Sequence, residues 1–444
     1  MTPDTPFYLN PGAPAPFLHW SLSTMKLRHI AVVAGVAVAG LSLSACSSSE
    51  PTSGPAEATD SLTIATTSNN QAPMEAVVAE YEAKTGIDVN LTVADTSQFQ
   101  TTIRTQLSSG TAPDVFTVWA GGGNPGAIQV LQGAGYLADL SDRPWVDTVD
   151  AGTAETLQID GKTYGLPSKL DAVGAIYNTA TLEELGLEVP TTYTDLLGYC
   201  ADVASAGKVA FALGIQSDWV TQLIPYALVA STVYADSPEF DAGLADGSET
   251  FAGSGWGDAF ESYLEMDEAG CFNKDPLGTD VTASYNLLNT GQAVGVVQVL
   301  ASYPQIMSTA PAGTEFGFFP LPGDDSGTPS IPRGIGVSFA VNADAVNEIN
   351  ALDFVDWLAT PEATSVWFSA APGIPAMSDA EVELDPVMQA AADIIAEGRT
   401  APMPDQGWPN AKAQSALFIG VQQLFSGQSG VDDVLGAMDE AFAG

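Results

Sequence analysis

The sequence contains few histidines, few cysteines and few basic residues. Among its 444 residues there are 2 histidines, 3 cysteines and 12 lysines and arginines, against 54 aspartates and glutamates. The formal net charge of −42 repels nucleic acid and anionic lipid headgroups, and it leaves no basic patch for phosphate binding. We therefore expect no nucleic-acid partner. Because the carboxylates are spread along the whole chain, they favour a solvated surface over a specific cationic partner.

The segment before residue 46 has the order of basic, apolar and small residues that is typical of a secretion signal. Lys26 and Arg28 form a short basic region, and an apolar run follows from Ile30 to about Leu43. This run of about 14 residues is shorter than the roughly 20 that a spanning helix needs. It ends at a Leu-Ser-Ala-Cys tetrapeptide that resembles a bacterial lipobox. In a lipobox the peptidase cuts before the cysteine, here Cys46, and the thiol carries a diacylglycerol.

These features divide the N-terminal part into three expected segments. Residues 1–24 contain no basic residue and fit no region of a signal peptide, so we expect Met25 to be the true start. Residues 25–45 form the expected lipoprotein signal peptide, and residues 46–60 form a flexible polar tether. Serines directly after Cys46 favour lipid attachment, whereas an ordinary signal peptide without a lipid is the alternative. The sequence thus predicts an exported protein that is lipid-anchored at the extracytoplasmic face of the cell membrane.

Removal of residues 1–45 would leave a chain without histidine, because His19 and His29 both lie in that segment. Such a chain excludes Ser-His-Asp and Cys-His catalysis and histidine metal sites. No Gly-x-Ser-x-Gly nucleophile motif is present. We expect a protein that is not an enzyme and that uses no metal and no cofactor. A glycosidase needs only two well-placed carboxylates, so cleavage of a carbohydrate remains an alternative.

Two cysteines, Cys200 and Cys271, remain once Cys46 is assigned to the lipid. Exported proteins fold in an oxidising compartment, where cysteine pairs tend to form disulfides. We therefore predict a disulfide between these two residues. Two separate buried thiols are the alternative.

The chain after the tether predicts a strand, a helix and a second strand. Residues 62–65 are typical of a short strand, and residues 87–93 alternate between apolar and polar side chains, as a half-buried strand does. Gly86 is expected to end the helix between them as a C-terminal cap. Strand, helix and strand within this length form a βαβ unit, so the sheet is at least partly parallel. The apolar face of the helix is formed by Met74, Val77, Val78 and Tyr81.

This alternation of strands and helices continues along the chain. Residues 99–107 predict a second helix and residues 114–119 a strand, so that Trp119 stands at a strand end. In open α/β sheets ligands bind outside the carboxyl ends of the strands, which makes Trp119 a candidate for a cleft. Residues 351–358 predict a buried helix, and Thr360-Pro361 is typical of the start of the next one. The pattern predicts an α/β protein.

From about residue 62 to the end, the chain resembles the family 1 extracellular solute-binding proteins, the maltose-binding-protein-like group of ABC sugar importers. Each matching segment is modest alone, but their order is kept over nearly the whole expected mature chain. The segments are YEAKTGIDV at 81–89, LSSGTAPDV at 107–115, GYLADL at 135–140, DGKTYGLP at 160–167, IYN at 176–178, LG at 185–186, VPT at 189–191, GQA at 291–293 and TPEA at 360–363.

The resemblance implies a two-lobed, type II periplasmic-binding-protein-like fold. Each lobe is expected to be a mixed, mostly parallel sheet flanked by helices, and crossover segments join the two lobes. Matching of segment positions places the crossovers near 170–173, 334–339 and 374–385. It places lobe one at 60–170 with 338–378, and lobe two at 172–334 with 385–444.

The resemblance also implies the function. The protein is expected to be a monomer that captures a carbohydrate, expected to be a di- or oligosaccharide, between its lobes. It would then deliver the sugar to an ABC permease that is driven by a separate ATPase. A different small solute, such as a polyamine or a phosphate ester, is the alternative ligand.

A sugar ring has an apolar face and a rim of hydroxyl groups, so its pocket needs aromatic platforms and fixed hydrogen-bond partners. Aromatic residues more often belong to a core, and Asp171 could simply be salt-bridged to Lys169. Gly121–Gly123 depart from the family, which carries a charged residue there, although glycines let the backbone approach a ligand. Arg333 could equally pair with a structural carboxylate. Positions matched to the family, the ends of predicted strands, a predicted crossover and a proline-rich loop together give the candidate ligand residues. They are Asn69, Asn70, Gln71, Trp119, Gly122, Gly123, Asp171, Gln216, Trp219, Gln298, Tyr303, Arg333 and Trp408.

Overall fold

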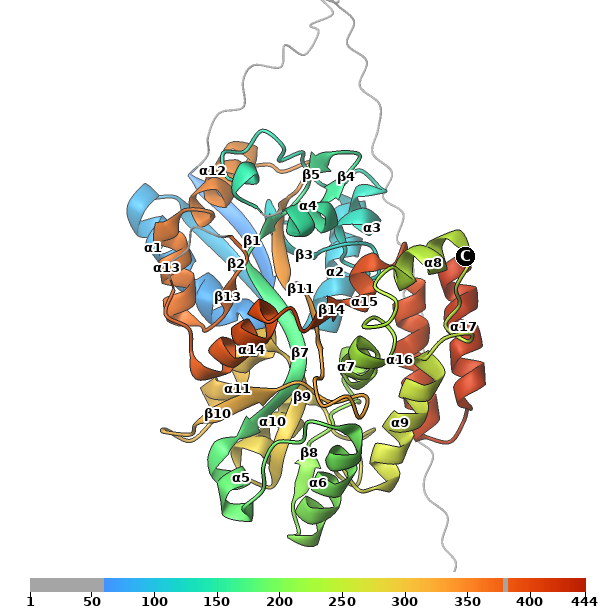
Figure 1. Ribbon diagram of the computed structural model, residues 1–444. Helices are drawn as coiled ribbons and strands as arrows, with labels where there is room; N and C mark the ends of the chain where they lie inside the picture. The colour runs from blue at the N-terminus through green and yellow to red at the C-terminus, as the bar shows by residue number, and fades with distance from the viewer. Residues whose placement is uncertain (1–59, 150, 378–381) are drawn as a thin grey trace, which may run out of the picture. The chain divides into compact units, whose positions relative to one another are not determined.

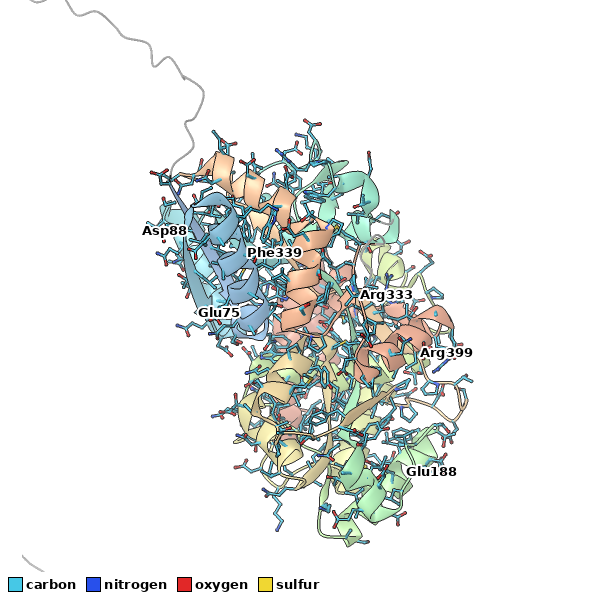
Figure 2. All side chains as sticks on the ribbon, turned by 90° about the vertical axis from the view of Figure 1, so that its left-hand side faces the viewer. Glu75, Asp88, Glu188, Arg333, Phe339 and Arg399 are labelled. Carbon is cyan, nitrogen blue, oxygen red and sulfur yellow. A yellow bond between two sulfur atoms is a disulfide. The ribbon has the colours of Figure 1, made fainter. Side chains whose placement is uncertain are left out.

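A computed structural model describes residues 60–149, 151–377 and 382–444 (Figure 1). The predicted start at Met25, the signal peptide at 25–45, the lipidated Cys46 and the tether lie outside the described residues, apart from Asp60. No helix in the described part of the chain combines the length and the apolar character that crossing a membrane requires. Acidic side chains lie on the surface of both parts of the molecule, for example Glu75, Asp88 and Glu188 (Figure 2).

One five-stranded sheet organises the first lobe. β1 pairs in parallel with β2 and β3, whereas β12 runs antiparallel to β3 and β6. The strand β12 comes from far along the sequence and lies between β3 and β6 in this sheet. The order across the sheet is β2 (Asp88–Ala94), β1 (Ser61–Thr67), β3 (Val115–Trp119), β12 (Val337–Val341) and β6 (Leu166–Pro167).

Helices cover both faces of this first sheet. Alternate strand residues point to opposite faces, so Phe339 packs with α1, α12 and α13 while Ala340 packs with α2 and α3. Short elements complete the lobe: α4 (Ala151–Leu157), β4 (Gln158–Ile159) and β5 (Lys162–Thr163). The covering helices are α1 (Gln71–Thr85), α2 (Thr96–Ser109), α3 (Ile128–Gln132), α12 (Glu348–Leu358) and α13 (Pro361–Ala370).

A second sheet, built around the long strand β7, organises the second lobe. Two pairs are parallel, β11 with β14 and β8 with β9, but β7 runs antiparallel to β9, β10, β11 and β13. The order is β14 (Thr400–Pro402), β11 (Ile331–Ile335), β7 (Lys169–Asn178), β9 (Ala293–Val299) and β8 (Val209–Phe211), with β10 (Phe316–Phe319) and β13 (Ile374–Pro375) also on β7.

The expectation of mostly parallel sheets is therefore wrong for the second lobe, although the sheets are mixed as expected. The physical reason is that β7 enters from the first lobe and fixes the direction against which four other strands pair. Hydrophobic alternation predicts which residues form a strand, but it carries no information on the direction of the neighbouring strand.

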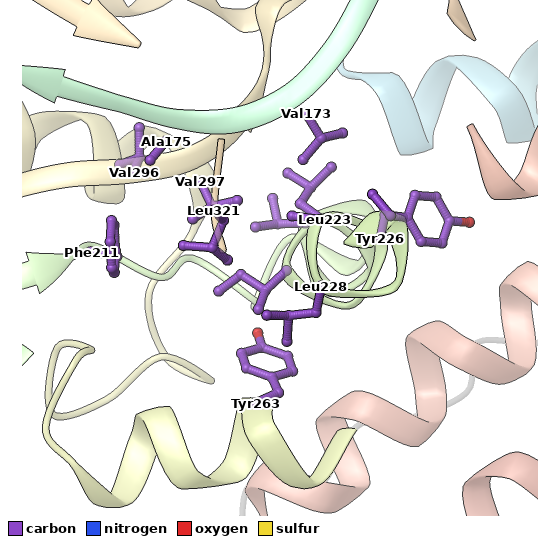
Figure 3. Close-up of a cluster of buried hydrophobic side chains, with 14 of the residues drawn as sticks. Val173, Ala175, Phe211, Leu223, Tyr226, Leu228, Tyr263, Val296, Val297 and Leu321 are labelled. Atoms are coloured by element: carbon purple, nitrogen blue, oxygen red, sulfur yellow. The ribbon is translucent and has the colours of Figure 1, made fainter. Parts of the chain in front are cut away.

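Helices of the second lobe enclose one large apolar core. Figure 3 shows Leu223, Tyr226 and Leu228 on α7, between Val173 of β7 and Tyr263 of α9. The helices of this lobe pack around the same core. They are α5 (Thr179–Leu185), α6 (Tyr193–Ser205), α7 (Leu223–Thr232), α8 (Phe240–Asp246), α9 (Trp256–Glu268), α10 (Val281–Asn289), α11 (Tyr303–Thr309), α14 (Pro386–Ala396), α15 (Pro404–Gly407), α16 (Lys412–Phe425) and α17 (Val431–Ala443).

The local predictions for helix ends are confirmed. Gly86 closes α1 in the left-handed conformation at φ 76°, and its N–H bonds to the carbonyl of Glu82. The Thr360 hydroxyl accepts the N–H of Ala363, and Pro361 occupies the first position of α13. These ends are set by local backbone chemistry, which is why the sequence predicts them.

The predicted disulfide is present. Cys200 on α6 and Cys271, which follows α9, are bonded, with their Cα atoms 4.7 Å apart. Both residues are fully buried in the core of the second lobe. The bond ties α6 to the segment that follows α9, and the two cysteines are 71 residues apart in the sequence.

The chain passes between the two sheets in short segments that lie side by side. Ser168 separates β6 from β7, and Gly336 separates β11 from β12. The Gly336 N–H donates to the Lys169 carbonyl at 2.9 Å, and the Ser168 hydroxyl donates to the Val337 carbonyl at 2.6 Å. The two crossovers therefore support each other where the lobes meet.

Candidate functional site

A cavity lies between the two lobes, beside the carboxyl ends of β1 and β3, where an open α/β sheet places its ligand. Both lobes and the crossover at Gly336 contribute to its wall. No lysine or arginine is among the described residues that line it. The lining residues are Thr67, Asn69, Asn70, Thr96, Gln100, Trp119, Asn124, Asp171, Trp219, Gln222, Leu223, Tyr226, Val299, Ala301, Ile335, Gly336, Val337, Met403, Asp405, Gln406 and Phe418.

Each lobe supplies one partly exposed tryptophan to this cavity. Trp119 is the last residue of β3, and Phe99 contacts its ring edge to face at 6.0 Å between centroids. Gly126 lies so close to the indole that a Cβ there would come within 2.9 Å of it. Trp219 stands on the short 3-10 helix Asp218–Gln222 of the second lobe. Trp119 is thus held by its neighbours while part of its ring remains accessible.

Asp171 brings a buried carboxylate to the wall from β7. Its Oδ1 atom accepts the N–H groups of Ala172 at 2.9 Å and Ala301 at 3.1 Å. Burial raises the pKa of Asp171 to about 6, and the positive charge of Lys169 works against that rise. No ion pair joins Asp171 to Lys169 among the described residues, so the simple salt-bridge alternative is not met. Lys169 is itself buried, which lowers its pKa.

Amide side chains supply neutral hydrogen-bonding groups around the cavity. Asn70 is fully buried, donates through Nδ2 to the Thr67 hydroxyl at 3.1 Å, and leaves its Oδ1 without a partner in the described part of the chain. Gln100 donates to the Asn124 side chain at 3.0 Å. Gln71, by contrast, is exposed at the start of α1, bonds to Glu75 and does not line the cavity.

Asp405 is a lining residue that the sequence did not indicate. It stands on α15, and its Oδ2 atom accepts the Gln414 side-chain N–H at 2.9 Å. Burial raises the pKa of Asp405 to about 7, and the carboxylate of Asp241 adds to the rise. The sequence analysis selected Trp408 in this loop, but the cavity is lined by Asp405 and not by Trp408. Only the aromatic character of Trp408 distinguished one position of that loop, and Asp405 is one of many acidic residues.

Three aromatic and amide candidates lie in the core of the second lobe instead of at the cavity. Trp408 is fully buried and contacts Tyr226, Phe251 and Trp256, with centroids 5.4–6.1 Å apart. Tyr303, which is 3% exposed, begins α11 and packs edge to face on Phe316. The physical reason is the same in both cases, because a large ring gains most from full burial. We correct the placement of these two residues and of Gln298, which is 1% exposed on β9.

Four other candidates also lie away from this cavity. Gln216 is exposed, and its N–H donates to the Thr279 carbonyl. Arg333 stands on β11 and lines a separate cavity with Asp241; Figure 2 labels it where the lobes meet. Gly122 and Gly123 pack against backbone of the second lobe, because a Cβ at Gly123 would lie 2.1 Å from the Asp405 carbonyl oxygen. These two glycines therefore lie against the protein backbone and do not line the cavity.

The structure thus brings five candidates together: Asn69, Asn70, Trp119, Asp171 and Trp219. The pattern of β-strand ends identified Trp119, and a position after a predicted strand identified Trp219. The family position identified Asn69, Asn70 and Asp171. Lining residues such as Gln100, Asn124 and Tyr226 were missed, because they lie on helices and loops whose sequence carries no special signal. Among residues 60–149, 151–377 and 382–444, no group of three or more acidic, histidine or cysteine side chains is arranged to hold a metal ion.

Comparison with protein families and curated proteins identifies relatives of this chain. A family model described as "Bacterial extracellular solute-binding protein" matches residues 65–365. The alpha-glucosides-binding periplasmic protein AglE of Rhizobium meliloti (strain 1021) is 24% identical over 402 residues, which cover 83% of each chain. The multiple sugar-binding protein of Streptococcus mutans serotype c is 24% identical over 119 residues. That match spans 27% of this chain and only 28% of the relative's length.

Solved structures share the fold. A chitin oligosaccharide binding protein superposes with a TM-score of 0.72 at 21% identity, covering 83% of this chain and 93% of that one. The solute-binding protein RafE in complex with raffinose gives a TM-score of 0.70 at 18% identity, covering 86% and 98%. At these identities the likeness shows the two-lobed fold.

Proposed function

Since the chain belongs to the bacterial extracellular solute-binding proteins, we propose that it captures a carbohydrate between its lobes and delivers it to an ABC importer. The expected ligand is a di- or oligosaccharide. We propose that the lobes occupy about 60–170 with 338–378 and 172–334 with 385–444, as the crossovers at Ser168 and Gly336 support.

One observation carries this proposal. The inter-lobe cavity combines a tryptophan from each lobe, Trp119 and Trp219, with the acceptor groups of Asp171, Asp405 and Asn70. Indole faces suit the apolar face of a sugar ring, and carboxylates and amides suit its hydroxyl groups. The names of relatives with the same fold, which include an alpha-glucosides-binding protein and a chitin oligosaccharide binding protein, support the same ligand class.

A thermal-shift screen with mono-, di- and oligosaccharides tests the proposal. A ligand that binds only the folded chain stabilises it by about 2.7 kcal/mol at a hundredfold excess over its dissociation constant, so a binding sugar raises the unfolding temperature. The proposal expects at least one sugar to do so in proportion to its concentration. No stabilisation by any sugar, together with stabilisation by a non-sugar solute, would contradict it.

A polyamine is the second candidate ligand, because two carboxylates with raised pKa values, Asp171 and Asp405, line the cavity, and no lysine or arginine is among its described lining residues. Spermidine belongs in the same screen for that reason. The absence of a lysine or arginine from the described lining disfavours a phosphate ester. The two carboxylates could also serve a glycosidase, so each stabilising sugar should be incubated with the protein and examined for cleavage products. We propose that the protein does not cleave the sugar, so the sugar should be found uncleaved after the incubation.

We further propose that the protein is exported and anchored through a lipid on Cys46, acts as a monomer, and needs neither cofactor nor metal. The permease and its separate ATPase are the proposed partners. Fractionation of cells that express the wild type and Cys46→Ala tests the anchor. The wild type should remain with the membrane, and the variant should appear in the soluble exported fraction. Equal membrane association of both would contradict lipid attachment.

A further inference from the structure

The glycine loop Gly121–Gly123 is fixed in the first lobe. The Gly121 N–H donates to the Thr156 carbonyl of α4 at 2.8 Å, and the Gly121 carbonyl accepts the Gln129 N–H of α3 at 3.0 Å. Gly121 also has a φ of 71°, a conformation that glycine adopts without steric cost. Contacts within the first lobe therefore help to define the position of this loop at the end of β3.

The backbone of α15, in the second lobe, rests directly on this loop. The Gly123 N–H donates to the Asp405 carbonyl at 3.0 Å. A Cβ at Gly123 would lie 2.1 Å from that carbonyl oxygen, and one at Gly122 would lie 2.6 Å from the Trp408 carbonyl oxygen. Because both obstacles are backbone atoms, no rotation of a side chain could make room. Only glycines allow the lobes to approach this closely here.

The same short helix also contacts the crossover and the cavity. The Gln406 side chain accepts the Ile335 N–H at 3.2 Å and donates to the Ile335 carbonyl at 2.6 Å, at the last residue of β11 before Gly336. The Asp405 carboxylate lines the cavity and accepts the Gln414 side-chain N–H. One helix of four residues thus joins the first lobe, the crossover and the candidate binding site.

We infer that Gly122, Gly123 and α15 form the contact that holds the lobes closed, and that Asp405 couples this contact to the ligand. A ligand that donates a hydrogen bond to the Asp405 carboxylate holds α15 in place. In that orientation the Asp405 carbonyl accepts the Gly123 N–H. The glycines are positioning residues in this account and do not contact the ligand. The coupling to a ligand rests on the proposed function, whereas the closing contact does not.

The variant Gly123→Ala tests the closing contact, because its Cβ overlaps a backbone atom of the opposite lobe only when the lobes are together. Gly198→Ala on α6 is the matched control, since a Cβ there meets nothing within 4 Å. Small-angle scattering of the full chain measures the radius of gyration without and with saturating sugar, and calorimetry measures the dissociation constant. The expected result is a larger radius and at least tenfold weaker sugar binding for Gly123→Ala.

Thermal unfolding separates this role from a purely structural one. The unfolding temperature of sugar-free Gly123→Ala should stay close to that of the wild type, while its radius changes. If Gly123→Ala does not fold, Gly122→Ala tests the contact with the Trp408 carbonyl; its Cβ would also come within 2.6 Å of the Gln129 side chain of the first lobe, which can rotate away because it is a side chain. A folded variant that has the radius and affinity of the wild type overturns the inference.

The sugar measurements also distinguish this inference from the proposed function. If neither the wild type nor Gly198→Ala binds any sugar, the proposed function fails. The radii of the sugar-free chains then decide the closing contact alone, and equal radii for the wild type and Gly123→Ala overturn it.

Discussion

Trp119 is held in place by the ring of Phe99 and by Gly126, so its indole is ready for a ligand before one arrives. We expect Trp119→Ala to weaken sugar binding about tenfold, which corresponds to about 1.4 kcal/mol of lost stacking. Trp119→Phe keeps an aromatic face and should recover most of the affinity. Calorimetric titration of the three proteins checks this order. Equal losses in the alanine and phenylalanine variants would argue against stacking on this residue.

Asp171 should make stability depend on pH. Burial raises its folded-state pKa to about 6, above the ordinary value of 3.8. Its contribution to stability is therefore fully present below about pH 4 and is lost as the pH rises through 6. Asp171→Asn keeps an Oδ1 acceptor for Ala172 and Ala301, so above pH 7 it should be more stable than the wild type by on the order of 2 kcal/mol.

Unfolding midpoints of the wild type and Asp171→Asn between pH 4 and pH 8 check this prediction. The difference between the two should be small at pH 4 and grow in favour of the variant as the pH rises. Asp88→Asn is the control, because Asp88 is an exposed aspartate on β2. A difference that stays constant with pH for Asp171→Asn would contradict the assignment.

The sequence predicts some site residues and misses others for a physical reason. Trp119 is predictable because strand ends of an α/β sheet face the ligand, and Trp219 because it follows a predicted strand. Tyr303 and Trp408 satisfy the same residue-type criterion but gain more from burial in the core. The sequence shows which residues are aromatic, but whether an aromatic face is buried depends on packing by segments that are distant in the sequence. Asp405 shows the converse, since its environment comes from α16 and α8.

At the scale of elements, the disulfide should stabilise the second lobe selectively. Cys200 and Cys271 close a loop of 71 residues between α6 and α9. Loss of such a crosslink typically costs about 2–5 kcal/mol. We expect the Cys200→Ala/Cys271→Ala double variant to unfold at a lower temperature and to exchange amide hydrogens faster in α6 and α9.

The first lobe provides the internal control for that experiment. Exchange in β1 and α1 should match the wild type, because the disulfide lies entirely in the other lobe. Faster exchange in both lobes to the same extent would mean that the bond stabilises the molecule as one unit, against this prediction.

The sequence predicted elements better than their arrangement. The spacing of Met74, Val77, Val78 and Tyr81 and the cap at Gly86 define α1 locally, and the structure agrees. The antiparallel pairings of β7 could not be predicted from the alternation of apolar and polar residues. The direction of each strand depends instead on how the chain crosses between the lobes. For the same reason, the approach of Gly121–Gly123 to α15 appears only in three dimensions.

For the whole molecule, a ligand that touches both lobes should favour the closed arrangement. A ligand shifts such a balance only by its differential affinity for the two states. We expect the radius of gyration measured by small-angle scattering to fall when a stabilising sugar saturates the protein. A sugar that does not raise the unfolding temperature is the control and should leave the radius unchanged. Binding without compaction would contradict closure around the ligand.

The central claim is that both lobes hold one sugar through their tryptophans. A crystal structure with the sugar that most raises the unfolding temperature tests this claim most directly. The account predicts that the bound sugar contacts Trp119 of the first lobe and Trp219 of the second, with hydroxyl groups within hydrogen-bond distance of Asp171. A sugar bound on one lobe alone, with neither indole in contact, would contradict it.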